Sequence, residues 1–182
     1  MLKQKISAFI LKVCGWKIEK EVDLPEKCVF CIAPHTSNWD FFVGFFAYPA
    51  IGGTGKQFMI KKDWFVFPFN LFFKAAGGIP VDRSKKVSTV DQLVEACNNS
   101  DHFHLGITPE GTRSANSNWK RGFYYIAKNA NIPIVLIYFD YGKKVVGLKK
   151  VFYPTDNADA DMAEIKDYYR GVTAKYPEKF VI

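Results

Sequence analysis

Long apolar runs are absent from the sequence, and none approaches the ~20 residues that a helix needs to span a bilayer. The chain also shows no cleaved signal peptide, no internal repeat, no low-complexity tract and no linker-like stretch. We therefore predict a single domain over residues 1–182 that does not cross a membrane. That length is sufficient for one well-buried core.

Cysteine is scarce, with four residues in the whole chain. Two of them stand in the segment Cys28-Val-Phe-Cys31, which is typical of a buried strand, and their odd separation directs the two thiols to opposite faces. A structural zinc site would need two more well-placed ligands. We expect reduced, buried thiols, no metal site and no cofactor, as is typical of a cytoplasmic protein.

Acidic residues are fewer than basic ones, 18 against 25, which leaves a net charge of +7 and a pI near 9.1. A basic balance favours anionic partners, and nucleic acid, an anionic membrane and phosphorylated small molecules all qualify. The basic clusters are short, and no nucleic-acid-binding motif is evident. We expect no nucleic-acid partner, and we expect an anionic membrane surface on the cytoplasmic side or a phosphorylated ligand.

Aromatic residues are abundant, at 16% of the chain, which indicates an apolar groove or a lipid-contacting surface in addition to a core. In residues 1–20 a helical stripe of apolar side chains is flanked by lysines. The stripe comprises Leu2, Ile6, Phe9, Ile10 and Val13. Two interpretations fit this amphipathic helix, which either packs on the core or lies flat in a membrane interface with its lysines toward the headgroups.

Apolar patterns predict strands that alternate with helices. The expected strands are Cys28–Ala33, Gln57–Ile60, Ile79–Val81, His102–Ile107, Ile134–Phe139 and Val145–Phe152. Helical patterns cover Phe41–Ala47, 68–77, 87–97, 122–131 and 162–172. The segment between the last two strands has the composition of a turn into an antiparallel pair. We therefore predict an α/β fold with a mixed, mostly parallel sheet flanked by helices.

The segment Ala33-Pro-His-Thr-Ser-Asn-Trp-Asp40 holds one of only three histidines. Pro34 keeps the chain extended after the strand, and Ser37 with Asp40 has the spacing of a capping box. Asp40 would then accept the imidazole N–H of His35 and leave the other ring nitrogen free to act as a general base. The alternative is that both residues only cap the helix.

Two further segments place charge at strand ends. In "GGIPVDRS", Arg83 follows a short strand at its carboxyl end, where ligands of α/β sheets gather. In "ITPEGTRS", Gly111 permits close backbone approach, Thr112 offers a hydroxyl, and Arg113 can hold an oxyanion by two bonds. Lys120 adds charge just before a helix N-terminus. Each segment alone also fits a polar surface turn.

Together, "PHTSNWD", "GGIPVDR", "PEGTR" and "WKRG" resemble the glycerolipid acyltransferase family that includes lysophosphatidic acid acyltransferases, over residues 16–155. The resemblance implies that His35 is the general base and Asp40 its orienting partner. It also implies an acyl-CoA or acyl-carrier-protein donor, a lysophospholipid-like acceptor, direct transfer and residence at a membrane surface. The residues that would bind the acceptor's head are Arg83, Glu110, Gly111, Thr112, Arg113 and Lys120, with Glu110 organising neighbouring cations.

Two departures from the family pattern are evident. "IPIVLI" keeps Pro133 but has Leu136 where a second proline is common, and the N-terminal amphipathic stretch is short. Three rival functions stay open at this point. They are a lipid-binding module without turnover, a hydrolase with Ser37 as nucleophile, and an N-acyltransferase.

Overall fold

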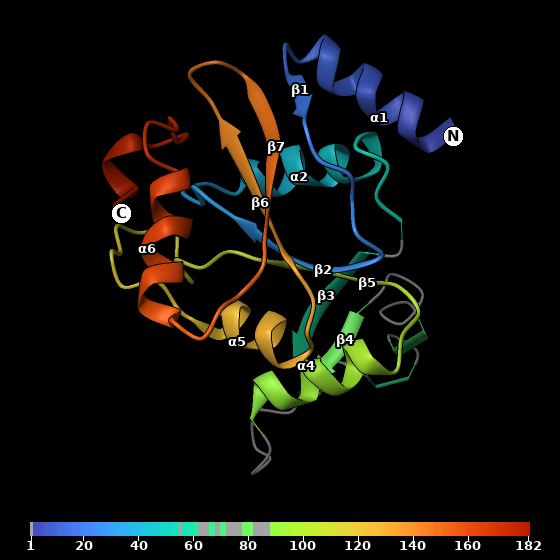
Figure 1. The fold of residues 1–182 in the computed structure, drawn as a ribbon. Coiled ribbons are helices and arrows are strands. Elements are labelled where there is room, and N and C mark those ends of the chain that lie inside the picture. Colours follow the sequence, from blue (N-terminus) through green and yellow to red (C-terminus); the bar gives the residue numbers. More distant parts are fainter. Residues whose placement is uncertain (1, 55, 62–65, 68–69, 72–77, 82–87) are drawn as a thin grey trace.

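The computed structural model describes residues 2–54, 56–61, 66–67, 70–71, 78–81 and 88–182 (Figure 1). Within these residues a seven-stranded sheet has the order β1-β7-β6-β2-β5-β3-β4, and only the β6–β7 pair is antiparallel. The strands are β1 (Lys17–Lys20), β2 (Lys27–Ile32), β3 (Lys56–Lys61), β4 (Gly78–Val81), β5 (Phe103–Ile107), β6 (Ile134–Asp140) and β7 (Val145–Phe152). The predicted mixed, mostly parallel α/β sheet is confirmed.

Helices cover both faces of the sheet (Figure 1). They are α1 (Leu2–Val13), α2 (Trp39–Ala50), α4 (Thr89–Asn98), α5 (Gly122–Asn129) and α6 (Ala158–Tyr168), with a 3₁₀ turn η2 at Pro177–Lys179. One core lies between the sheet and α4, α5 and α6, and a second lies between the sheet and α1 and α2. Cys31 belongs to the first core and Cys28 to the second, so the predicted opposite directions of these thiols are confirmed.

Strand β2 lies at the centre of the sheet and sets the position of the candidate site. It pairs in parallel with β5, where Cys31 is in register with Ile107, and with β6, where Ile32 is in register with Ile137. The carboxyl ends of the three strands therefore lie side by side at one edge. The segments that follow them must meet there, as the rule for ligand sites in α/β sheets requires.

The N-terminal region differs from the expected helix over residues 1–20. Helix α1 ends at Val13, and Lys17–Lys20 form β1, a strand parallel to β7. Gly15, with a φ of +80°, supplies the left-handed conformation that terminates the helix. The last helix also ends earlier than expected, at Tyr168, and the expected helix over 68–77 lies mostly outside the described residues.

The apolar stripe of α1 faces outward. Ser7 and Leu11 form the buried side of the helix, whereas the side chain of Phe9 is 66% exposed. Leu2, Ile6 and Val13 are exposed as well. Helix α2 packs beside α1 and also presents aromatic side chains to the outside, including Phe41 at 68% exposure. Core packing is therefore wrong for Leu2, Ile6, Phe9 and Val13, whereas Ile10, the fifth residue of the stripe, is partly buried.

Candidate active site

His35 and Asp40 meet at the junction between β2 and α2. The strand ends at Ile32 and the helix begins at Trp39, so His35 lies in the connecting loop and Asp40 in the first helical turn. The His35 Nδ1 atom is 3.1 Å from Asp40 Oδ2. Because an ionised carboxylate only accepts hydrogen bonds, Nδ1 is the donor in this contact, and in a neutral ring this tautomer leaves Nε2 as a proton acceptor. The expected contact is present.

Asp40 is held as an ionised carboxylate although it is only 3% exposed. Its Oδ2 accepts the backbone N–H groups of Thr36 at 3.0 Å and Ser37 at 2.9 Å, and its Oδ1 accepts the hydroxyl of Tyr141 at 2.7 Å. Burial raises the pKa of Asp40, but hydrogen bonds from His35, Tyr141 and Ser37 outweigh it and lower the pKa overall. The carboxylate therefore stays charged at neutral pH.

The predicted capping box is formed only in part. Asp40 accepts the Ser37 N–H as a capping box requires, but the N-cap is Asn38 rather than Ser37. The Ser37 hydroxyl accepts the Trp39 N–H at 3.2 Å, and Ser37 is buried. The Asp40 carboxylate accepts the N–H groups of Thr36 and Ser37, because the contact with His35 already places it over this loop.

Glu110 holds the main chain of His35. Its carboxylate is 4% exposed and accepts the His35 N–H through both oxygens, at 3.1 and 2.9 Å. Burial raises the pKa of Glu110 to about 7, against the lowering effect of the hydrogen bond from His35. We expected Glu110 to organise neighbouring cations, but its described hydrogen bonds fix the backbone of the histidine instead.

A polar pocket of about 480 Å³ opens beside the His35 ring, whose side chain is 18% exposed. The described residues that line it are His35, Thr108, Gly111, Thr112, Arg113 and Ser114. Lys120 lies against this loop, because a Cβ added to Gly111 would come within 2.9 Å of the Lys120 Cε. The structure thus brings five predicted residues together around this pocket, and the predicted Asp40 and Glu110 both bond His35. The five are His35, Gly111, Thr112, Arg113 and Lys120. Arg83 lies outside the described residues.

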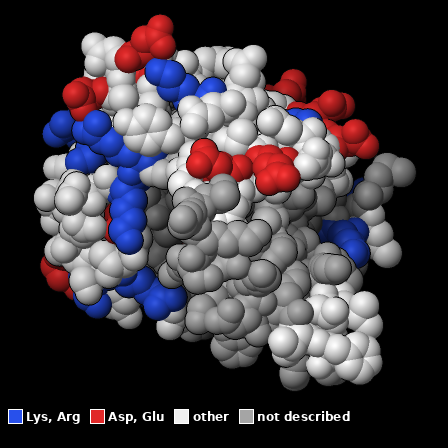
Figure 2. Space-filling view, turned by 90° about the horizontal axis from the view of Figure 1, so that it is seen from below, with Lys and Arg blue, Asp and Glu red and all other residues white. Residues whose placement is uncertain are grey.

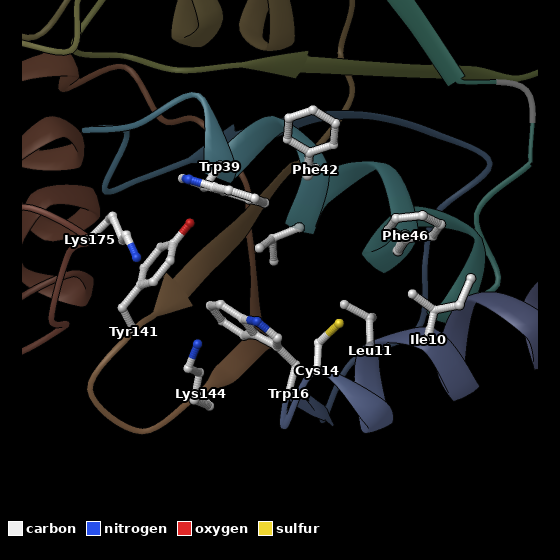
Figure 3. Close-up of a pocket in the computed structure, with 11 residues that line it drawn as sticks. Ile10, Leu11, Cys14, Trp16, Trp39, Phe42, Phe46, Tyr141, Lys144 and Lys175 are labelled. Carbon is white, nitrogen blue, oxygen red and sulfur yellow. The ribbon is translucent and has the colours of Figure 1, made fainter.

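An apolar pocket of about 370 Å³ lies between α1, α2 and the β6–β7 turn (Figure 3). Its lining is Ile10, Leu11, Cys14, Trp16, Trp39, Phe42, Val43, Phe46, Tyr141, Lys144 and Lys175. Trp39, Tyr141 and the two lysines stand at one end, and Ile10 and Phe46 at the other. Asp40 therefore lies between two pockets, since it bonds His35 of the polar pocket and Tyr141 of the apolar one.

Comparison with known proteins identifies the chain at the level of its family. The family model described as Acyltransferase matches residues 16–140, which includes the segments of His35, Asp40 and Glu110. The chain belongs to the acyltransferase family. No curated protein matches its sequence.

The fold of this acyltransferase is also that of a solved relative. It is similar to the crystal structure of the 1-acyl-sn-glycerophosphate (LPA) acyltransferase PlsC from Thermotoga maritima, with a TM-score of 0.61 and 13% sequence identity. The match covers 96% of this chain and 79% of the PlsC chain. At that identity the likeness concerns the arrangement of the sheet and helices.

Sequence reasoning missed the part of the candidate site that comes from the C-terminal third of the chain. Tyr141 follows β6, and its sequence context indicated only a turn. The Tyr141 N–H donates to the Thr173 carbonyl at 2.8 Å, and the Tyr176 N–H donates to Thr36 Oγ1 at 3.1 Å. The one available signal was the position of Tyr141 at a strand's carboxyl end, beside the strand that leads to His35.

Proposed function

We propose that the protein is an O-acyltransferase that moves a fatty acyl group from a thioester, acyl-CoA or acyl-carrier protein, to a hydroxyl of a lysophospholipid-like acceptor. The observation that carries the proposal is the 3.1 Å contact between His35 Nδ1 and a charged, buried Asp40, beside an open polar pocket. In an acyltransferase, that arrangement suits a neutral imidazole that accepts a proton at Nε2.

The proposed reaction uses this geometry. His35 Nε2 removes the proton from the acceptor hydroxyl as its oxygen bonds to the thioester carbonyl carbon. Asp40 stabilises the imidazolium that forms. The tetrahedral oxyanion then re-forms the carbonyl and breaks the carbon–sulfur bond, and the imidazolium returns its proton to the departing thiolate. Ser37 is not needed as a nucleophile, and its buried hydroxyl is engaged with the Trp39 N–H.

The polar pocket suits the head of an anionic acceptor. Arg113 lines it and Lys120 lies against its Gly111. Guanidinium groups bind phosphate through paired hydrogen bonds, and an ammonium adds a point charge. Lys and Arg side chains also form a band on one side of the face shown in Figure 2. We propose that Arg113 and Lys120, with Arg83, hold the acceptor's phosphate.

The apolar pocket suits an acyl chain. Its walls are aliphatic and aromatic side chains of α1 and α2, and its end at Tyr141 and Trp39 adjoins Asp40 (Figure 3). Burial of a methylene group contributes about 0.8 kcal/mol, so a chain of several methylenes is strongly favoured there. Lys144 and Lys175 at the same end suit an anionic group carried by the lipid.

The outer faces of α1 and α2 support work at a membrane surface. No helix among the described residues has the length and apolar character to cross a bilayer. However, Leu2, Ile6, Phe9 and Val13 form an exposed apolar stripe on α1, in a chain of net charge +7. An amphipathic helix of this kind lies in the interface and is drawn to anionic lipid. We propose a peripheral position on the cytoplasmic face.

The decisive experiment measures acyl transfer from acyl-CoA and acyl-carrier protein to a panel of lysolipids and amino-acid-derived amines. His35→Ala is expected to lower kcat about 10²- to 10⁴-fold, the range that general acid–base catalysis contributes. The matched control is His102→Ala, because His102 is an exposed histidine outside both pockets. Undiminished turnover by His35→Ala contradicts the proposal. Tight lysolipid binding without product identifies a binding module, and transfer to amines alone identifies an N-acyltransferase.

A further inference from the structure

The two oxygens of Asp40 have different partners. Oδ2 contacts His35 Nδ1 and the loop N–H groups, whereas Oδ1 accepts the Tyr141 hydroxyl at 2.7 Å. Tyr141 follows β6, and the two residues are 101 positions apart in the sequence. The match to the family model ends at residue 140 and therefore does not include this tyrosine.

Tyr141 is itself held firmly. Its N–H donates to the Thr173 carbonyl, and its ring packs edge-on against Trp16 with 5.0 Å between centroids. The ammonium groups of Lys144 and Lys175 lie 5.9 and 5.5 Å from the centre of the same ring. Burial and the hydrogen bond to Asp40 raise the pKa of Tyr141, so the hydroxyl is a neutral donor at any working pH. The Tyr141 ring is therefore held in place, and its hydroxyl donates to Asp40 Oδ1 from a fixed position.

We infer that Tyr141 is a positioning residue, whose hydroxyl fixes the rotation of the Asp40 carboxylate and shares its charge, so that the carboxylate orients the His35 ring before the reaction. This inference rests on the proposed function, because it concerns how the His35–Asp40 pair is prepared. Tyr141 also lines the apolar pocket, so the same side chain touches both the proposed acyl site and the pair.

Removal of the hydroxyl changes the charge balance in one direction. Without it, Oδ1 keeps more negative charge, which favours the imidazolium form of His35 and also makes Asp40 easier to protonate. Both effects move the acid limb of the kcat/KM–pH profile, where activity falls as the pH is lowered, to higher pH. Substitution of Tyr141 by phenylalanine leaves the other titratable or charged groups around His35, Asp40 and Tyr141 in place. These groups are Glu110, Arg113, Lys144, Lys175 and Tyr176.

The test is Tyr141→Phe, which keeps the ring and its packing. The matched control is Tyr124→Phe, which removes a similar buried hydrogen bond, 2.9 Å from the Tyr124 hydroxyl to Asp161 Oδ2, in the core on the other face of the sheet. We expect Tyr141→Phe to lower kcat roughly tenfold, the loss of one hydrogen bond to a charged group. KM for donor and acceptor should stay unchanged, and the acid limb should move to higher pH. Tyr124→Phe should change none of these.

A double-mutant cycle of Tyr141→Phe with Asp40→Ala distinguishes an effect through Asp40 from a general folding defect. If Tyr141 acts through Asp40, Tyr141→Phe causes no further fall in kcat when Asp40 is already alanine. A wild-type kcat and acid limb in Tyr141→Phe, with His35→Ala inactive, overturns the positioning role and leaves the proposed function intact. An equal loss in both Asp40 backgrounds also overturns it. Full activity in His35→Ala refutes the proposed function instead.

Discussion

The buried carboxyl group of Glu110 makes the stability of the protein depend on pH, and a single substitution should remove this dependence. Burial raises its pKa from 4.5 to about 7, although its hydrogen bond from His35 favours the charged form. Between these two values the folded protein binds a proton that the unfolded chain has released. Stability from this group is therefore complete below about pH 4.5 and is lost as the pH rises to 7.

The magnitude follows from linkage. The shift from 4.5 to about 7 corresponds to roughly 3 kcal/mol, at 1.36 kcal/mol for each pH unit. Glutamine at this position resembles the protonated acid, and its amide oxygen can still accept the His35 N–H. Glu110→Gln should therefore match the wild type near pH 5 and exceed its free energy of unfolding by about 2–3 kcal/mol at pH 8.

Urea unfolding across pH 5 to 8 measures this difference directly. The control is Glu95→Gln, because Glu95 is exposed on α4, and its curve should run parallel to that of the wild type. Parallel curves for Glu110→Gln and the wild type would show that the carboxyl is already paired with a cation. Lower stability of Glu110→Gln at pH 8 would show that the carboxylate stabilises the loop more than its burial costs.

Two further substitutions test the polar pocket and the outer face. Arg113→Ala should raise the acceptor KM at least tenfold, because a hydrogen bond to a charged group contributes about 1.5–3 kcal/mol. The donor KM should stay near its wild-type value. An equal rise in both KM values contradicts an acceptor site at this pocket. Phe9→Ser should weaken sedimentation with anionic vesicles roughly tenfold, the loss of one buried aromatic side chain. Tyr153→Ser, at an exposed aromatic residue after β7, is its control, and equal vesicle binding by both variants contradicts the membrane face.

The alternation of strands and helices, and with it the α/β sheet, could be predicted because each element carries its own apolar pattern. The His35–Asp40 contact could also be predicted, since the two residues share one loop and one helical turn. Strand β1 could not, because the four residues Lys17–Lys20 have no apolar alternation of their own and become a strand only by pairing with β7. The end of α1 did have a signal in the sequence, because Gly15 follows the last apolar residue of the helical pattern and adopts the left-handed conformation that ends a helix.

The role of Glu110 could not be predicted for a related reason. Its neighbours in the sequence are Gly111, Thr112 and Arg113, and that context indicated a side chain that organises cations. The carboxylate instead bonds a residue 75 positions away, because β2 and β5 lie in register. Sequence pattern places a residue at a strand end, but the partner of its side chain depends on which strand lies beside it.

Strand order also explains how one carboxylate comes to lie between two different pockets. β2 has β5 on one side and β6 on the other, and all three end at the same edge. The loop after β5 supplies the polar pocket and holds the His35 backbone, whereas the turn after β6 supplies Tyr141 and part of the apolar pocket. Under the proposed function, the acceptor's polar head and the acyl chain would bind to separate pockets, which are built on the two strands that flank β2. The proposal also places the reacting hydroxyl at His35, between the two pockets. On that proposal, substitutions that line one pocket should alter the binding of one substrate and leave the proton transfer at His35 unchanged.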